Sequence, residues 1–101
     1  MSRPRHKLAT ESLSQVVWTL GARQGVQQVW NYVSQFAPLA AQRIVLRLVT
    51  TGDSLSEYPL RGRSIGGGIR ELTIVAPYLI QCRVENSVVE ILTVRHGARE
   101  H

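Results

Sequence analysis

Six side chains in the C-terminal third of the chain have the strongest potential for chemistry. The imidazole of His96 has an ordinary pKa of about 6.5, so it can accept or donate a proton close to neutral pH. The nearby guanidinium groups present fork-shaped donors that suit carboxylates and, less specifically, phosphates. An unaided histidine is a weak catalyst, and binding is therefore favoured over catalysis. The candidate residues for binding a target or partner are Arg70, Glu71, Arg83, Arg95, His96 and Arg99.

Metal, cofactor and thiol chemistry are not expected from this sequence. The single cysteine, Cys82, excludes an internal disulfide and a multi-cysteine zinc site, and its position predicts a small buried side chain. His6 and His101 lie at the two ends without a second ligand nearby, so no metal site is assigned. The glycines at 66–68 precede a β-type run, which is typical of a mobile turn and not of a phosphate-binding loop.

The net charge of +5 is unevenly distributed along the chain. Arg3, Arg5 and Lys7 contribute three of the five units and lie in a region without sustained apolar periodicity. Residues 1–14 are therefore predicted to form a flexible basic extension, and residues 15–101 a single, nearly balanced domain. The pI of about 10.4 invites a nucleic-acid-binding interpretation, but most of the excess charge belongs to the predicted extension.

The length and hydropathy favour a cytoplasmic globular protein. The chain has 101 residues, the size of one domain, and 44% of them are hydrophobic. The longest uncharged, largely apolar run covers residues 72–82, whereas a bilayer span needs about 20 residues. No apolar segment follows the basic start, as it would in a secretory signal peptide. We therefore expect no contact with a membrane.

The elements that must position these residues begin with a strand and two helices. Residues 15–19 are β-branched and aromatic, which predicts a strand, and Thr19 can cap the helix that follows. Pro38 is well placed to open a second helix, with Gly52 loosening its later part and Tyr58-Pro59 ending it. The short link predicts an antiparallel hairpin. The apolar faces comprise Val26, Val29, Trp30, Val33 and Phe36 in the first helix, and Ala41, Ile44, Val45, Leu48 and Leu55 in the second.

The remainder of the chain has the pattern of a β-meander. Residues 60–68 contain four of the eight glycines and predict a flexible basic loop. Three β-type runs follow at 69–75, 78–84 and 88–95, and the last is apolar on both faces, which predicts a central strand. The predicted fold is α+β, in the order β-α-α-β-β-β, with the hairpin packed on a small, mainly antiparallel four-stranded sheet. The orientation of the first strand stays open. Core packing is expected for the aromatic residues Trp18, Trp30, Tyr32 and Phe36.

Several short motifs occur in a fixed order between about Val16 and Arg99. They are Val17-Trp18, Trp30-Asn31-Tyr32-Val33, Pro38-Leu39-Ala40-Ala41-Gln42-Arg43, the segment from Leu55 to Arg63 with the pattern L-x-E-x-P-x-x-G-R, Arg70-Glu71-Leu72, Pro77-Tyr78-Leu79-Ile80 with Arg83-Val84, Val89-Glu90-Ile91-Leu92, and the ending His96-Gly97-Ala98-Arg99. Together they resemble the ParE/RelE family of toxins from bacterial type II toxin–antitoxin systems.

The resemblance implies one of two activities. The ParE branch consists of DNA gyrase poisons, and the RelE branch of ribosome-dependent endonucleases that cut messenger RNA. Leu79 stands where the nuclease branch often has an arginine, and the C-terminal tyrosine of many nucleases is absent after Arg95. We therefore expect a ParE-like gyrase inhibitor with no catalytic residues. In the alternative, a RelE-like nuclease, the catalytic candidates are His96, Arg95 and Arg99.

The resemblance also implies the partners. A ParD-like antitoxin would lay an amphipathic helix or extended segment across the hairpin and sheet. DNA gyrase would be the target, nucleic acid would be met only indirectly, and either a homodimer or a toxin–antitoxin hetero-oligomer would be possible. The expected consequences are growth arrest and plasmid stabilisation. For Arg70 and Arg83, a plainer alternative is cross-strand pairing with Glu90, Glu71 or Glu85. A third hypothesis, a basic nucleic-acid-binding module, depends on charge alone.

Overall fold

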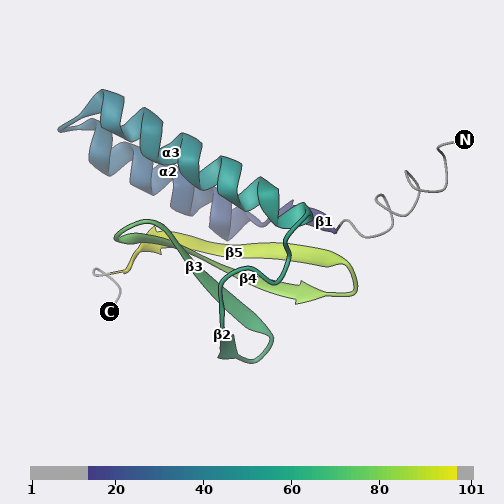
Figure 1. Cartoon of the computed structure of the whole chain (residues 1–101). Helices are drawn as coiled ribbons and strands as arrows, with labels where there is room; N and C mark the ends of the chain where they lie inside the picture. Colours follow the sequence, from purple (N-terminus) through teal and green to yellow (C-terminus); the bar gives the residue numbers. More distant parts are fainter. Residues whose placement is uncertain (1–13, 98–101) are drawn as a thin grey trace, which may run out of the picture.

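The computed structural model describes residues 14–97, which form a layer of two helices on one face of a five-stranded sheet (Figure 1). The element order is β1 (Gln15–Trp18), α2 (Leu20–Ser34), α3 (Pro38–Asp53), the 3-10 turn η1 (Ser54–Ser56), β2 (Arg63–Gly66), β3 (Ile69–Val75), β4 (Tyr78–Glu85) and β5 (Val88–His96). The predicted α+β class is confirmed. The predicted extension over residues 1–14 lies almost wholly outside the described residues.

Helix α2 is attached to the sheet at its first turn. The Thr19 hydroxyl accepts a hydrogen bond from the Ala22 amide at 3.2 Å and donates one to the Ile91 carbonyl at 2.7 Å. The predicted cap is thus present, and it also joins the helix start to β5. Ala22, Gly25 and Val29 form the buried side of the helix. The small residues in this face allow α2 to lie close to β5.

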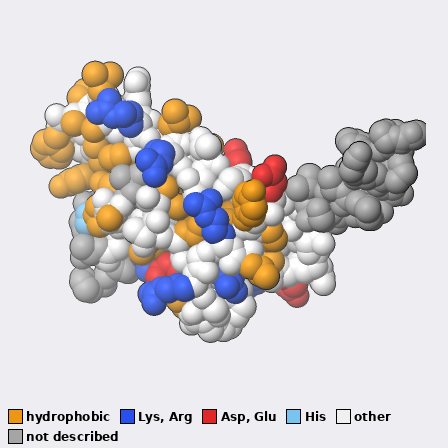
Figure 2. Space-filling view, viewed as in Figure 1, with side chains coloured by type: hydrophobic (Ala, Val, Ile, Leu, Met, Phe, Trp, Pro, Cys, Tyr) orange, Lys and Arg blue, Asp and Glu red, His pale blue; other side chains and the backbone are white. Residues whose placement is uncertain are grey.

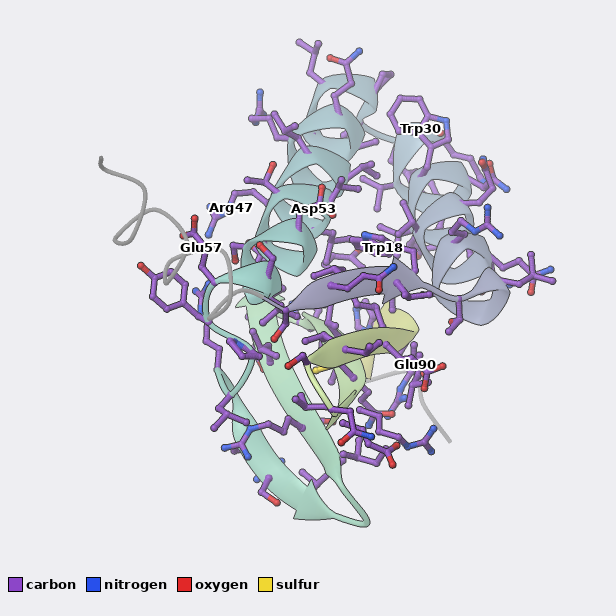
Figure 3. All side chains as sticks on the ribbon, turned by 90° about the vertical axis from the view of Figure 1, so that its right-hand side faces the viewer. Trp18, Trp30, Arg47, Asp53, Glu57 and Glu90 are labelled. Carbon is purple, nitrogen blue, oxygen red and sulfur yellow. The ribbon has the colours of Figure 1, made fainter. Side chains whose placement is uncertain are left out.

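Helix α3 begins at Pro38 as predicted but ends earlier than expected. It stops at Asp53 and continues as one 3-10 turn, so a helix reaching Tyr58 is wrong. Gly52 does not loosen the helix: it is buried, and a Cβ placed there would overlap the ring of Trp18. The Trp18 indole donates to the Asp53 carboxylate at 2.9 Å, beside the end of α3 (Figure 3). The glycine therefore makes room for the tryptophan that joins β1 to α3.

The sheet has the strand order β1-β5-β4-β3-β2. β1 runs parallel to β5, which settles the orientation left open by the sequence, and the other neighbours are antiparallel. β5 has a strand on both sides, so its predicted central position is confirmed. The predicted four-stranded sheet is wrong by one strand, because residues 63–66 within the expected flexible loop pair with β3. All four residues of β2 are exposed, so hydrophobic patterning does not reveal this edge strand.

The core lies between the helices and the sheet. Cys82 is fully buried, as predicted. Of the four aromatic residues expected in the core, Trp18 packs against it and Trp30 is half-buried. The core role is wrong for Tyr32 and Phe36, which are 47% and 71% exposed. The physical reason is that the hairpin tip projects past the sheet (Figure 1): Tyr32 lies in the last turn of α2, and Phe36 lies in the turn that follows the helix. The buried hydrophobic residues are Ala22, Val29, Ala41, Leu48, Leu55, Leu72, Tyr78, Ile80, Cys82, Val89, Ile91 and Val94. Neither helix in residues 14–97 is long and apolar enough to cross a bilayer.

Candidate functional site

Four polar side chains form a hydrogen-bonded row on the face of the sheet opposite the helices, here called the open face. Arg63 of β2 contacts Glu71 of β3 at 3.0 Å between Nη2 and Oε1. The Gln81 amide of β4 donates to the other carboxylate oxygen of Glu71 at 3.0 Å. Nη1 of Arg95 in β5 donates to the side-chain oxygen Oε1 of Gln81 at 3.2 Å. The row therefore crosses four strands and has a cation at each end.

Glu71 is the electrostatic centre of this row. Its side chain is only 14% exposed, so the carboxylate is largely shielded from water. The hydrogen bond from Gln81, followed by that from Arg63, lowers the pKa of the Glu71 carboxyl from its ordinary value of 4.5. Since both carboxylate oxygens accept hydrogen bonds, the ionised form is favoured and no oxygen is held ready to take a substrate proton.

Arg83 also lies on the open face, at the far end of β4. It contacts Glu90 of β5 at 3.4 Å, and both side chains are more than two-fifths exposed. The cross-strand alternative predicted for Arg83 is therefore observed with Glu90. An exposed pair of this kind contributes at most about 1 kcal/mol to stability. The Arg83–Glu90 pair is a solvated surface ion pair, and it is not part of the row around Glu71.

Arg70 lies on the other face of the sheet, turned towards the helices. It stands beside Cys82 in the strand register, and its Nη2 donates to the Gly62 carbonyl at 3.5 Å. Within residues 14–97, Arg70 forms no ion pair with Glu71, Glu85 or Glu90, so the cross-strand pairing suggested for it is wrong. The reason is the alternation of a strand, which sends consecutive side chains to opposite faces. The candidate set drawn from the sequence therefore groups Arg70 with residues that lie on the opposite face of the sheet.

His96 faces the helices as well. Its ring packs edge-on against Tyr78 at 5.2 Å between centroids, and both line a cavity of about 210 Å³ beneath α2. The His96 Nδ1 atom is buried and has no hydrogen-bond partner within residues 14–97. Arg95 donates to the open-face row, so these two adjacent residues serve opposite sides of the sheet. Arg99 lies outside the described residues.

Leu79, which stands where the nuclease branch often has an arginine, lies on the open face. It pairs in register with Arg95 and with Thr73. Residues 14–97 contain no group of three or more histidine, cysteine or carboxylate side chains that could hold a metal ion. The described part of the open face therefore offers ion pairs and hydrogen bonds as its chemistry.

Sequence reasoning missed Arg63 and Gln81 as members of the row. Arg63 fell in a segment interpreted as a loop, and an isolated glutamine carries no motif. A usable signal exists in the alternation of β4, because residues 79, 81 and 83 share one face. The strand register then places Gln81 of β4 beside Glu71 of β3. This contact joins two different strands, so the alternation within one strand does not predict it.

A second surface feature is an exposed apolar patch at the hairpin tip. The Tyr32 and Phe36 rings form an edge-to-face pair with centroids 5.5 Å apart, and Leu39 is 67% exposed. Figure 2 shows hydrophobic side chains gathered over this end of the helices. Large exposed apolar groups that lie together are typical of protein-binding surfaces.

The comparisons with known proteins all find toxins or a toxin–antitoxin system. The family model described as "ParE toxin of type II toxin-antitoxin system, parDE" matches residues 16–101. "Toxin RelE2" of Caulobacter vibrioides is 48% identical over 87 residues, covering 86% of this chain and 99% of that protein. "Toxin RelE1" of the same organism is 31% identical, covering 84% and 95%. A chain from the solved structure titled "Chromosomal ParDE TA system from P. aeruginosa" superposes with a TM-score of 0.74 at 22% identity, covering 84% of this chain and 97% of that one.

Proposed function

Because the chain belongs to the ParE toxin family of type II toxin–antitoxin systems, we propose that it arrests growth by binding DNA gyrase, and that a cognate ParD-like antitoxin neutralises it. The toxin acts as an inhibitor that leaves gyrase bound to cleaved DNA, without a reaction of its own. The observation that carries this proposal is the open face of the sheet, where Leu79 stands at the position of the arginine that is frequent in the nuclease branch, and each carboxylate oxygen of Glu71 accepts a hydrogen bond.

The chemistry of RNA cleavage supplies the argument. Attack by a 2′-hydroxyl needs a base for its proton, an acid for the leaving oxygen and cations for the crowded phosphorane. Glu71 is held in its ionised form by two hydrogen bonds, which removes it as an acid. His96 stands against Tyr78 on the helix side, away from the guanidinium group of Arg95. These placements favour binding over catalysis.

The hairpin tip supports a protein target. Tyr32 and Phe36 present two rigid rings to solvent, and aromatic side chains are the most common anchors of protein interfaces. We assign this patch to the contact with gyrase. The residues proposed from sequence, Arg70, Glu71, Arg83, Arg95, His96 and Arg99, stay proposed partner contacts, with Glu71 and Arg95 joined in one row.

The test is a supercoiling assay with purified gyrase and the full chain. We expect loss of supercoiling and accumulation of cleaved DNA, both reversed by the antitoxin. Phe36→Ser should weaken inhibition by roughly tenfold, since it removes an exposed anchor. Leu20→Ser is the matched control, because Leu20 is 62% exposed at the opposite end of α2 and should leave inhibition unchanged. Full supercoiling at excess toxin would refute the proposal.

The names of two relatives favour a second candidate function. Proteins named Toxin RelE2 and Toxin RelE1 resemble this chain over most of its length, and the RelE branch cuts messenger RNA in the ribosome. This alternative predicts codon-phased transcript cleavage during translation, abolished by His96→Ala, Arg95→Ala or Arg99→Ala. Transcript ends mapped during growth arrest decide between the two, since intact transcripts exclude the nuclease.

A further inference from the structure

A small cavity lies between helix α2 and the ends of β4 and β5. Its volume is about 210 Å³. One wall is a single face of α2, because the lining residues Gln28, Val29 and Tyr32 are three or four positions apart. The opposite wall belongs to the sheet, where Tyr78 begins β4 and His96 ends β5. The cavity is therefore formed where the helical hairpin passes over the end of the sheet (Figure 1).

The lining of this cavity includes a polar atom whose hydrogen-bonding capacity is not used. Nδ1 of His96 is buried and has no hydrogen-bond partner within residues 14–97. The imidazole is held in position by the Tyr78 ring, which it meets edge-on, and the two residues are paired in the strand register. A buried polar atom without a partner costs free energy, so proteins nearly always supply one from the chain, from water or from a ligand. The cavity is the space beside His96 that can hold such a partner.

The apolar part of the lining distinguishes a ligand from water. Val29, Val94 and Tyr78 all line the cavity, and all three are buried. A buried water molecule needs two to four polar partners, which aliphatic side chains cannot supply. An engineered apolar cavity of about 150 Å³ in another protein holds benzene, so 210 Å³ gives room for one ring or two fused rings. The size and lining therefore favour an aromatic occupant.

The charges around the cavity favour an uncharged occupant. None of the described residues that line it is acidic, so a buried cation would have no counter-ion there. Arg95 also lines the cavity, but its guanidinium group donates to Gln81 on the open face. An anion would therefore have to draw this group away from the hydrogen-bonded row.

We propose that the cavity binds a small, uncharged aromatic molecule of one or two fused rings that carries an N–H or O–H group. The rings pack against Val29, Val94 and Tyr78, and the N–H or O–H group donates to Nδ1 of His96. This hydrogen bond requires the neutral imidazole with its proton on Nε2, which leaves Nδ1 as the acceptor.

Tyr32 connects the cavity with the hairpin tip. Its side chain lines the cavity and also forms the edge-to-face pair with Phe36. A ligand that packs against Tyr32 covers part of this ring, so less of it is available to gyrase. Occupation of the cavity should therefore weaken inhibition. This last step rests on the proposed function, whereas the binding of the ligand does not.

The first test titrates the full chain with indole and follows its backbone amides by nuclear magnetic resonance. Indole has two fused rings and one N–H group, and 1-methylindole has the same rings without the donor. At pH 8 a histidine is ordinarily neutral. Indole should shift the amide signals of the cavity lining and bind with a Kd of about 1 mM, as expected for so few atoms. 1-Methylindole should bind roughly fivefold more weakly, because it makes no hydrogen bond.

Three variants locate the binding site. His96→Phe keeps a ring against Tyr78 but removes the acceptor, so it should weaken indole binding roughly fivefold and leave 1-methylindole binding unchanged. Val29→Phe fills the cavity with a ring and should abolish the binding of both probes. If circular dichroism shows that Val29→Phe does not fold, His96→Phe carries the test. Gln24→Phe is the matched control, because Gln24 is exposed on α2 outside the cavity lining and should bind both probes as the parent chain does.

Four results would overturn the binding proposal. They are no indole binding at the limit of its solubility, equal affinity for indole and 1-methylindole, full indole affinity in His96→Phe, and tighter binding of benzoate than of indole, which would indicate an anion site.

The second test repeats the supercoiling assay with saturating indole. The toxin concentration needed for half-inhibition should rise at least about twofold, and gyrase with indole but without toxin is the control. Unchanged inhibition by the indole-bound toxin would refute the link through Tyr32 alone. Absence of inhibition without indole would refute the proposed function and leave the binding result standing.

Discussion

The close contact between α2 and β5 at Gly25 leads to a sharp stability prediction. Gly25 is buried, and a Cβ added there would overlap the carbonyl oxygen of Val94 and lie 3.1 Å from the Val94 carbonyl carbon. This obstacle is backbone, and Val94 is paired in register with Ile80 of β4. No side-chain rotation can relieve the overlap, so Gly25→Ala must push the helix away from the sheet.

The size of the effect follows from two opposing contributions. Alanine in place of glycine stabilises a helix interior by up to about 1 kcal/mol. Overpacking that forces a backbone shift costs about 1–3 kcal/mol, and the overlap with backbone at Gly25 favours the upper end. The net loss is about 2 kcal/mol. In a domain of this size each kcal/mol lowers the melting temperature by about 4–8 °C, so Gly25→Ala should lower it by roughly 8–16 °C.

The assay is thermal and urea unfolding of the purified chain followed by circular dichroism. Gly21→Ala is the matched control, one turn earlier on the same helix. The nearest atom to its added Cβ is the Leu92 carbonyl oxygen at 3.3 Å, and Gly21 is exposed. Its stability should stay within about 0.5 kcal/mol of the parent chain. A Gly25→Ala variant that melts at or above the parent temperature would contradict the argument.

Three other predictions concern the sheet. Because the pKa of Glu71 is lowered in the folded chain, its stabilising effect is present above pH 4.5 and lost as the pH falls through that lowered value. Urea unfolding should therefore show the parent chain more stable than Glu71→Gln at about pH 7, with the difference shrinking at about pH 3. Burial raises the pKa of the Cys82 thiol, so Ellman's reagent should label it only after unfolding; rapid labelling of the folded chain would contradict its burial. Gly62→Ala should destabilise the chain by at least about 1 kcal/mol more than Gly66→Ala, because both have positive φ but only Gly62 is crowded; equal losses in urea unfolding would show that crowding is unimportant.

Much of the fold could be predicted from local patterns. Apolar spacing in the two helices and the capping positions of Thr19 and Pro38 are local properties, and both helix starts are confirmed. The aromatic side chains at the hairpin tip were misjudged for a physical reason. Periodicity extends the apolar face from Val29 to Phe36, but it shows neither that α2 ends at Ser34 nor that the hairpin tip projects past the sheet.

The candidate site could be predicted only in part. Glu71 and Arg95 were identified by residue type, whereas the partners that join them, Arg63 and Gln81, come from two further strands. β2 was missed because its residues are all exposed, and because the turn that joins it to β3, at Gly67 and Gly68, lies in a run of glycines that also fits a loop. A contact between distant residues leaves no periodic signal in a single sequence.

The sequence by itself determined the α+β class, the order of the main elements, the burial of Cys82 and, through motifs in a fixed order, membership of the toxin family. Only the tertiary structure decided which face of the sheet each charged residue serves. Consecutive strand residues point in opposite directions, so Arg95 joins the open-face row while His96 packs under α2. The side on which the helices pack then determines which of these residues can meet a partner.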